Sequence, residues 1–206
     1  MDSEHDFQTI YEEYYQKIIQ YLTRIAGPND AEDIAQDVFD KINRNLGAFR
    51  GQSKLSTWIY RIATNTAIDR MRSAAHKYAQ GCTTIDEADD ARPENGGVAH
   101  KEAAADQTLI RKEMSECVLE FIDKLPPDDR TVIVLSEIEG LTNKEIADII
   151  GISLDNAKIR LHRARARLRT LLNKGCDFYH NEENVLACDR KPSQILPKPP
   201  GGLRSS

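Results

Sequence analysis

The most constraining feature of this sequence is the segment Leu141–Leu172, whose pattern predicts two short helices joined by a tight turn. Thr142 and Glu145 have the spacing of a capping box and predict that the first helix begins directly after Thr142. Gly151 predicts its end, because glycine adopts the positive φ that closes a helix at little cost. Ser153 predicts the N-cap of the second helix. This is the spacing of a helix-turn-helix, whose second helix lies in the major groove of DNA.

The second of these helices has one apolar stripe and is otherwise strongly basic. The stripe consists of Ala157, Leu161, Ala164, Leu168 and Leu171. No acidic residue occurs between Lys158 and Arg169. A run of charge is usually a solvated face. Here the turn directs the basic face outward, so motif and charge together predict contact with DNA.

The net charge of the 206-residue chain is −5, so the positive potential for DNA binding must be local, as on this helix. The first residues are acidic and lack the apolar region of a signal peptide. No apolar run reaches the roughly eighteen residues that predict a membrane span. The four cysteines are scattered and do not form a disulfide framework. We therefore expect a cytoplasmic protein without membrane insertion.

Two N-terminal segments show apolar residues at helical spacing. The first extends from Phe7 to Ile25, and Gly27 and Pro28 follow it. The second extends from about Asp30 to Ile42. Its outward face consists of Asp33, Gln36, Asp37 and Asp40. The simplest interpretation of this acidic and polar face is solvation, and a docking surface is the alternative.

A loop and a third helix follow, and together they carry aromatic and basic residues. The loop is the segment 49–54, and one face of the helix consists of Trp58, Arg61, Asn65, Asp69 and Arg72. A helical tryptophan usually packs in the core. This face nevertheless combines a stacking surface, positive charge and an amide, which are the groups that unpaired bases require.

The helical pattern is lost from Ser73 to about Gln107, where acidic residues, Pro and Gly predict a flexible linker. Helical spacing returns at Leu109, and a further helix is expected between Pro127 and Gly140. The predicted fold class is all-α, with two small helical domains. We expect a three-helix domain at 1–73, an acidic linker at 74–107, a helix-turn-helix domain at 108–173 and a cysteine-containing tail at 174–206.

Cys176, His180 and Cys188 in the tail are candidate metal ligands within thirteen positions. They lack the C-x2-C clip and the fourth ligand of structural zinc sites. Packing is the simplest interpretation, and zinc binding and a redox-sensitive thiol pair are the alternatives. Cys117 is most simply a core residue. We expect no metal and no cofactor, and we expect disorder in the final Pro-, Gly- and Ser-rich stretch.

Three blocks carry a family resemblance: Asp30–Phe39, Phe49–Arg72 and Leu125–Arg169. In this order they resemble an extracytoplasmic-function (ECF, group IV) sigma factor of the sigma-70 family. The match covers both predicted domains, with a linker where the family has one. Three blocks in register are far more specific than a single helix-turn-helix.

The resemblance implies a protein that binds core RNA polymerase, recognises promoter DNA, opens the duplex and catalyses no reaction itself. The first domain would correspond to the family's region 2 and the second to region 4. An anti-sigma factor is a further candidate partner. The implied polymerase-binding residues are Asp30, Asp33, Gln36, Asp37 and Phe39. The implied −10 residues are Phe49, Arg50, Gln52, Lys54, Trp58, Arg61, Asn65 and Arg72, and the implied −35 residues are Ser153, Asp155, Asn156, Lys158, Ile159, Arg160, His162 and Arg163.

The main alternative is a stand-alone helix-turn-helix regulator that binds duplex DNA. It explains the segment 141–172 but not the Trp58 face or the loop before it. An enzyme is the second alternative, but the sequence has no G-x-S-x-G, P-loop or H-E-x-x-H motif. The tail cysteines could add a stress-responsive layer to the first interpretation.

Overall fold

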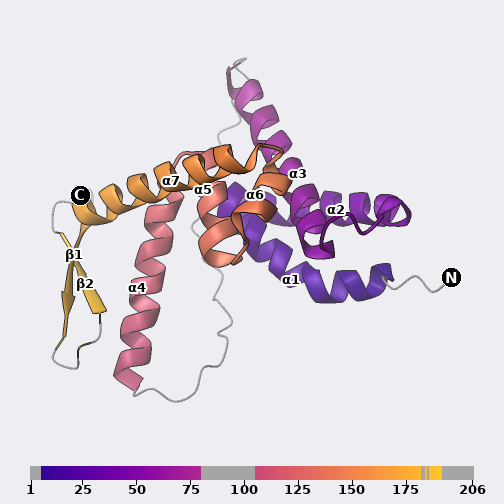
Figure 1. Cartoon of the computed structure of the whole chain (residues 1–206). Helices are drawn as coiled ribbons and strands as arrows, with labels where there is room; N and C mark the ends of the chain where they lie inside the picture. Colours follow the sequence, from indigo (N-terminus) through magenta and orange to yellow (C-terminus); the bar gives the residue numbers. More distant parts are fainter. Residues whose placement is uncertain (1–5, 80–104, 182–183, 185, 192–206) are drawn as a thin grey trace, which may run out of the picture. The chain divides into compact units, whose positions relative to one another are not determined.

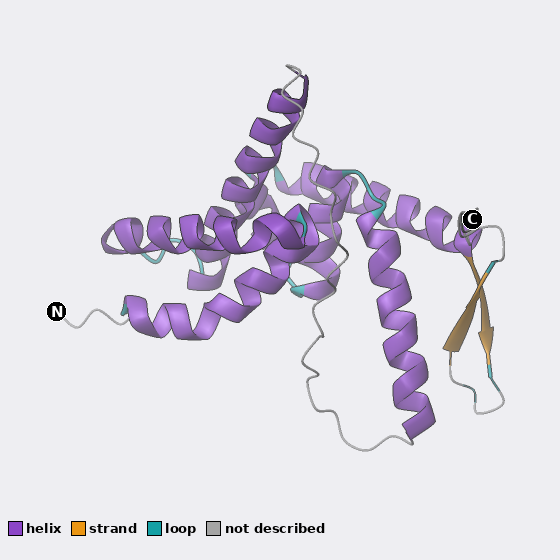
Figure 2. Ribbon diagram, turned by 180° about the vertical axis from the view of Figure 1, so that it is seen from behind, coloured by secondary structure: helices purple, strands orange, loops and turns teal. Residues whose placement is uncertain are grey.

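The computed structural model describes residues 6–79, 105–181, 184 and 186–191. The described residues form seven α-helices and one two-stranded antiparallel sheet (Figures 1 and 2). They fall into two compact units. Of the described residues, 6–79 and 125–165 form the first unit, and 105–124, 166–181, 184 and 186–191 form the second. The domain expected at 108–173 is therefore divided between the two units.

Three helices begin the first unit: α1 (Phe7–Ala26), α2 (Pro28–Asn45) and α3 (Leu55–Ala79). Gly27, at φ 93°, separates α1 from α2 in a conformation that favours glycine. A short 3₁₀ turn, Leu46–Ala48, follows α2 and leads into the loop before α3. The core between these helices is aliphatic and includes Ile18, Leu22, Ile34, Val38, Ile42 and Ile59. The predicted three-helix arrangement is thus confirmed.

The other helices of the first unit supply the helix-turn-helix. Helix α5 (Pro127–Ile133) continues as the π-helical turn Val134–Ile138 and is followed by α6 (Asn143–Ile150) and α7 (Leu154–Gly175). The capping box is present, because Thr142 and Glu145 each accept a hydrogen bond from the other's backbone N–H. Gly151 ends α6 in the left-handed conformation, at φ 70°. Both sequence predictions are confirmed.

The second unit contains α4 (Ala105–Asp123), the end of α7 and a hairpin of β1 (Cys176–His180) and β2 (Leu186–Arg190). The all-α expectation missed this hairpin, although the fold remains predominantly helical. Helix α3 extends to Ala79 and α4 begins at Ala105, so both helices reach into the segment 74–107 that we expected to be linker. The acidic residues 86–94 and the final Pro- and Gly-rich stretch lie outside the described residues.

None of the helices in the described part of the chain combines the length and apolar composition that a membrane span requires.

Candidate nucleic-acid interface

The start of α7 presents a polar face opposite a buried stripe. Ala157, Leu161 and Ala164 are buried, as the sequence predicted. Ser153 caps the helix, since its Oγ accepts a hydrogen bond from Asn156 N at 3.2 Å. The exposed residues here are Ser153, Asp155, Asn156, Lys158, Ile159, His162 and Arg163, whereas Arg160 is half-buried. The structure therefore brings the predicted duplex-reading residues onto one helix face.

Ion pairs engage some of the cations on this helix. Arg165 Nη2 lies 2.6 Å from a carboxylate oxygen of Glu137, and Arg160 Nη1 lies 3.8 Å from one of Asp128. Lys158 pairs with Asp155 within the helix, at 3.4 Å. Arg163 has no ion-pair partner among the described residues. Its charge is thus available for a phosphate or a base edge.

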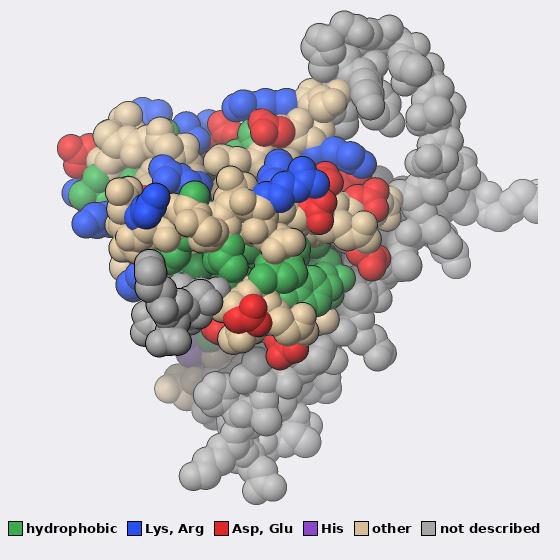
Figure 3. Space-filling view, turned by 90° about the vertical axis from the view of Figure 1, so that its right-hand side faces the viewer, with side chains coloured by type: hydrophobic (Ala, Val, Ile, Leu, Met, Phe, Trp, Pro, Cys, Tyr) green, Lys and Arg blue, Asp and Glu red, His purple; other side chains and the backbone are tan. Residues whose placement is uncertain are grey.

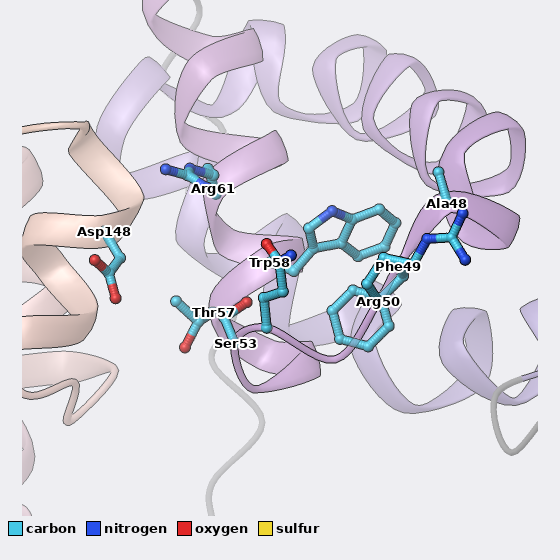
Figure 4. Close-up of a pocket in the computed structure, with 9 residues that line it drawn as sticks. Ala48, Phe49, Arg50, Ser53, Thr57, Trp58, Arg61 and Asp148 are labelled. Atoms are coloured by element: carbon cyan, nitrogen blue, oxygen red, sulfur yellow. The ribbon is translucent and has the colours of Figure 1, made fainter.

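A pocket of about 370 Å³ lies between the segment Ala48–Ser53, the start of α3 and α6 (Figure 4). Its lining consists of Ala48, Phe49, Arg50, Gln52, Ser53, Thr57, Trp58, Arg61 and Asp148. The Phe49 and Trp58 rings are in contact, with centroids 5.2 Å apart and planes at 42°. Trp58 is half-buried rather than a core residue. Aromatic surface and two arginines therefore meet in one concave site.

The hydroxyl of Thr57 is an unusual part of this lining. Thr57 is 3% exposed, and its Oγ1 has no hydrogen-bond partner within the described part of the chain. A buried polar atom without a partner costs about 1–3 kcal/mol, so such atoms need an explanation. Thr57 Oγ1 is therefore a buried polar atom that the described residues leave unsatisfied.

The α6 helix contributes an acidic wall to the same site. Asp148 lines the pocket opposite the loop (Figure 4). On the same helix, Glu145 Oε1 lies 2.9 Å from Lys54 Nζ. The Thr142 backbone N–H, followed by Lys54, lowers the pKa of Glu145 to about 2. Tyr60 of α3 also donates a hydrogen bond to Glu139, whose pKa is raised by burial. The first contact joins α6 to the loop before α3, and the second joins α3 to the residue that follows the π-helical turn Val134–Ile138.

The pocket includes some predicted −10 residues and leaves out others. Lys54, Asn65 and Arg72 are exposed but do not line it. Asn65 and Arg72 continue the exposed face of α3 beyond Arg61. Sequence reasoning missed Thr57 and Asp148. Thr57 precedes a tryptophan without any distinguishing pattern, and only the packing of α6 on α3 brings Asp148 to the pocket.

The predicted polymerase-binding face of α2 is exposed except at one position. Gln36 and Asp37 are exposed, and Asp30 and Asp33 lie 3.9 Å and 3.6 Å from Arg70 of α3. Phe39 is the exception, because it is 4% exposed. Its ring packs against Tyr11 and Tyr15 of α1, at centroid distances of 4.9 Å and 5.7 Å. Phe39 therefore shapes this surface from beneath and does not form part of it.

The region around the start of α1 and the end of α2 also exposes apolar surface. Tyr11 is 36% exposed, above the buried Phe39 ring. Figure 3 shows hydrophobic side chains gathered on this side of the molecule, with Lys and Arg mainly above them and Asp and Glu at the margins. Such a surface, apolar with a charged rim, is typical of protein-binding sites.

Two family descriptions match the chain over these helices. "Sigma-70 region 2" matches residues 10–77, and "Sigma-70, region 4" matches residues 115–168. The ECF RNA polymerase sigma factor SigW of Bacillus subtilis is 38% identical over 177 residues, which cover 81% of this chain and 88% of SigW. The chain belongs to the ECF sigma-70 family.

Other sigma factors are similar over a comparable length. The RNA polymerase sigma-H factor of Pseudomonas aeruginosa is 34% identical over 161 residues, which cover 77% of this chain and 82% of that relative. The ECF sigma-E factor of Haemophilus influenzae is 33% identical over 163 residues, covering 77% and 83%.

Two solved structures show the same fold. RpoE of Bartonella quintana, in complex with the anti-sigma factor NepR, has a TM-score of 0.63 at 22% identity and covers 82% of this chain and 97% of that chain. CnrH, in complex with the cytosolic domain of CnrY, has a TM-score of 0.55 at 24% identity and covers 84% and 92%.

The family membership gives these surfaces their context. As a sigma factor, the chain acts with RNA polymerase in promoter recognition and transcription initiation, and the members of this family are not enzymes. The region 2 match contains the pocket's loop and α3, and the region 4 match contains the start of α7. The hairpin lies beyond both matched ranges.

Proposed function

We propose that this sigma factor captures an extruded base of the −10 element in the Trp58 pocket and reads the −35 duplex with α7. The polar face of α2 binds core RNA polymerase. These roles assign a different surface to single-stranded DNA, to duplex DNA and to protein. The work takes place in the bacterial cytoplasm, where RNA polymerase transcribes, and involves no bond-making step or cofactor of the sigma factor's own.

The observation that carries the −10 assignment is the chemistry of the pocket lining. Stacking of a base on an aromatic side chain contributes about 1–3 kcal/mol and tolerates any base. The contacting rings of Phe49 and Trp58 offer that stacking surface. The unpartnered Thr57 hydroxyl offers a hydrogen bond to the edge of the base, and Arg50 and Arg61 offer charge to the neighbouring phosphates. The volume of about 370 Å³ lies at the lower end of the range of small-molecule pockets.

The exposed start of α7 supports the −35 assignment. A recognition helix reads bases through its N-terminal residues, and here the outward-facing ones include the polar Asp155, Asn156 and Lys158. Arg163 offers a bidentate contact to a base edge or a phosphate, and Ile159, 50% exposed, offers apolar contact. The ion pairs of Arg160 and Lys158 are exposed, so phosphates can replace their partners at little cost.

The polymerase assignment rests on the exposed carboxylates of α2 and the apolar surface beside them. Asp33 and Asp37 give this face a negative charge, and Tyr11 adds exposed aromatic area. Charge complementarity with a basic partner accelerates docking and fixes its orientation. An anti-sigma factor is a further proposed partner, since the similar RpoE was solved in complex with one.

Reconstitution with core RNA polymerase tests the proposal. We expect the full chain to direct core enzyme to start sites selected from a promoter library, and to make thymines of the −10 element reactive to permanganate. Trp58→Ala should abolish most of this reactivity. Asp69→Ala, on the same face of α3 but outside the pocket lining, is the matched control and should retain it. Promoter-specific binding of the free chain without polymerase, and no initiation with it, would instead support a stand-alone regulator.

A further inference from the structure

The second unit gathers three cysteine side chains from three elements. Cys117 lies on α4, Cys176 begins β1 and Cys188 lies on β2. Cys117 Sγ and Cys176 Sγ are 3.6 Å apart, and the three sulfur atoms all lie within 4.8 Å of one another. Cys117 and Cys176 are buried, and Cys188 is half-buried. None of the three belongs to a promoter-binding surface, so the proposed function leaves the cluster unexplained.

The strand register and a glycine create the cluster. Cys176 is paired with Arg190, and Cys188 lies two residues before Arg190, so both cysteines lie on one face of the hairpin. A Cβ at Gly175 would overlap the ring of Phe121 on α4. The absence of a side chain at this position therefore allows α4 to approach the start of β1. Leu168, Leu171 and Leu172 of α7 pack against the same cluster.

The hairpin buries sulfur and exposes its large apolar side chains. Phe178, Tyr179 and Leu186 are 41%, 44% and 42% exposed, whereas Cys176 is only 2% exposed. An isolated two-stranded hairpin is at best marginally stable, and side chains that stay exposed contribute little hydrophobic stabilisation. The ion pair of Arg190 with Glu120 of α4 is exposed and adds little more. A bond through the clustered sulfur atoms would supply the stabilisation of the hairpin that its packing lacks.

We propose that Cys117, Cys176 and Cys188 form a three-thiolate site for a thiophilic metal ion, Zn²⁺ or Cu⁺, which fastens the hairpin to α4. In a tetrahedral zinc site the Zn–S distance of about 2.3 Å places sulfur atoms about 3.8 Å apart. The separation of 3.6 Å between Cys117 and Cys176 is close to this value. Thiolate ligands select Zn²⁺ and Cu⁺ over hard cations such as Mg²⁺ or Ca²⁺.

The ligand set differs from the one that the sequence suggests. His180 is exposed at the far end of β1, opposite Leu186, and does not belong to the cluster. Cys117 takes its place, although it lies far away in the sequence. Within the described ranges, no other His, Cys or carboxylate joins the three thiols. The fourth position of a tetrahedral ion is thus left for water or an external ligand.

Metal titration of the full-length, reduced, chelator-treated chain tests this site. We expect one equivalent of Zn²⁺ in competition with a chromophoric zinc chelator, or one equivalent of Cu⁺ in competition with bicinchoninate, and the two arms identify the ion. Each of Cys117→Ser, Cys176→Ser and Cys188→Ser should weaken binding at least about 100-fold, more than loss of an outer-shell partner typically does. Cobalt substitution should give a thiolate-to-metal charge-transfer band that is absent from these variants.

Matched variants make the result specific. Cys82→Ser removes a thiol outside the described residues, and His180→Ala removes the neighbouring imidazole, so both should bind with unchanged affinity. Loss of affinity in His180→Ala, or full affinity in Cys117→Ser, would overturn the proposed ligand set. The proposal fails if the reduced chain binds neither ion stoichiometrically. If air oxidation joins Cys117 to Cys176 in a protein that binds no metal, the cluster is instead a redox pair.

A second measurement separates metal binding from misfolding. Cys188 is the least buried of the three, so Cys188→Ala should keep the helical circular dichroism and transcription with core polymerase. We expect metal to slow hydrogen exchange of residues 176–190 in the natural chain and to leave it unchanged in Cys188→Ala. Equal protection in both proteins would contradict the site while leaving the promoter assignments intact.

Discussion

The Trp58 pocket is concave and aromatic, whereas the start of α7 is an exposed helix face dominated by cations. The pocket offers stacking, an unpartnered hydroxyl and a volume of about 370 Å³. The α7 face offers charges that lie in solvent and in part pair with nearby carboxylates. In the proposed function, one surface would therefore gain its binding energy from burying a base, and the other from exchanging counterions along a duplex.

This difference separates two steps of initiation that a single sigma factor must perform. In the proposed function, a base enters the pocket only after it has left the stack, so the pocket would stabilise the opened promoter. The face of α7 would contact duplex DNA, which is present before and after opening. Substitutions in the pocket should therefore affect opening, and substitutions on α7 should affect binding, with a stronger dependence on salt.

The largest effect is expected for Trp58→Ala. Loss of about 1–3 kcal/mol of base stacking should lower the open-complex population about 5- to 150-fold while closed-complex binding changes little. Permanganate reactivity and footprinting of the closed complex at low temperature measure the two steps separately. Trp58→Phe keeps a stacking surface and should retain much of the activity. If Trp58→Ala lowers closed-complex binding as much as it lowers the open-complex population, the two surfaces do not act in different steps.

The next largest effect is expected for Arg163→Ala. This change should weaken promoter binding by the polymerase holoenzyme about tenfold, since a specific contact from an arginine contributes about 1–3 kcal/mol. The slope of log Kd against log salt should also decrease by about one. Arg165→Ala is the matched control on the same helix, because Glu137 lies 2.6 Å from its guanidinium. An equal loss in Arg165→Ala would mean that α7 contributes only unspecific charge.

Thr57→Val should give effects of opposite sign on stability and on opening. The variant removes a buried hydroxyl that has no partner in the described structure, so the free energy of unfolding should increase by up to about 1 kcal/mol. Promoter opening should decrease several-fold, because the base loses a hydrogen bond. Denaturant unfolding and permanganate reactivity measure the two quantities.

The control for this prediction is Thr64→Val on the same helix. The Thr64 hydroxyl is also buried, but it lies 2.7 Å from Tyr21 Oη and donates to the Tyr60 carbonyl. This substitution should therefore lower the free energy of unfolding. A loss of stability of the same size in Thr57→Val would show that its hydroxyl is satisfied and has no role in base capture.

The sequence predicted the helices and the exposed face of α7 better than it predicted the pocket and the thiol cluster. Helical periodicity and the capping box concern neighbouring residues, so the limits of α6 and the buried stripe of α7 could be derived directly. The acidic wall of the pocket depends on Asp148, which reaches the pocket only when α6 packs against α3. That packing is a tertiary contact with no sequence period.

The sequence did not predict the hairpin or the thiol cluster, and the reasons are related. The strands 176–180 and 186–190 are short, and their burial does not follow a clear alternation. Sequence spacing groups His180 with Cys176 and Cys188, because all three residues lie in the tail. Cys117 had the appearance of an ordinary core residue, and it is indeed buried. Only the approach of α4 at Gly175 reveals its second potential role.

The smallest effect concerns Glu145, which joins α6 to the loop before α3 through its ion pair with Lys54. Its pKa is lowered from 4.5 to about 2, first by the Thr142 backbone N–H and then by Lys54. A lowered pKa in the folded state adds stability above the unfolded pKa, and this contribution is lost as the pH falls from about 4.5 to about 2. The natural chain should therefore unfold at higher denaturant concentration than Glu145→Gln at pH 7, and this difference should shrink towards pH 3. Lys54→Met removes the ion pair and leaves the cap of α6 intact. Because the ion pair is exposed and contributes little, this variant should unfold at nearly the same denaturant concentration as the natural chain. A difference between the natural chain and Glu145→Gln that stays constant from pH 7 to pH 3 would show that the Glu145 charge stabilises neither the cap nor the link between α6 and the loop.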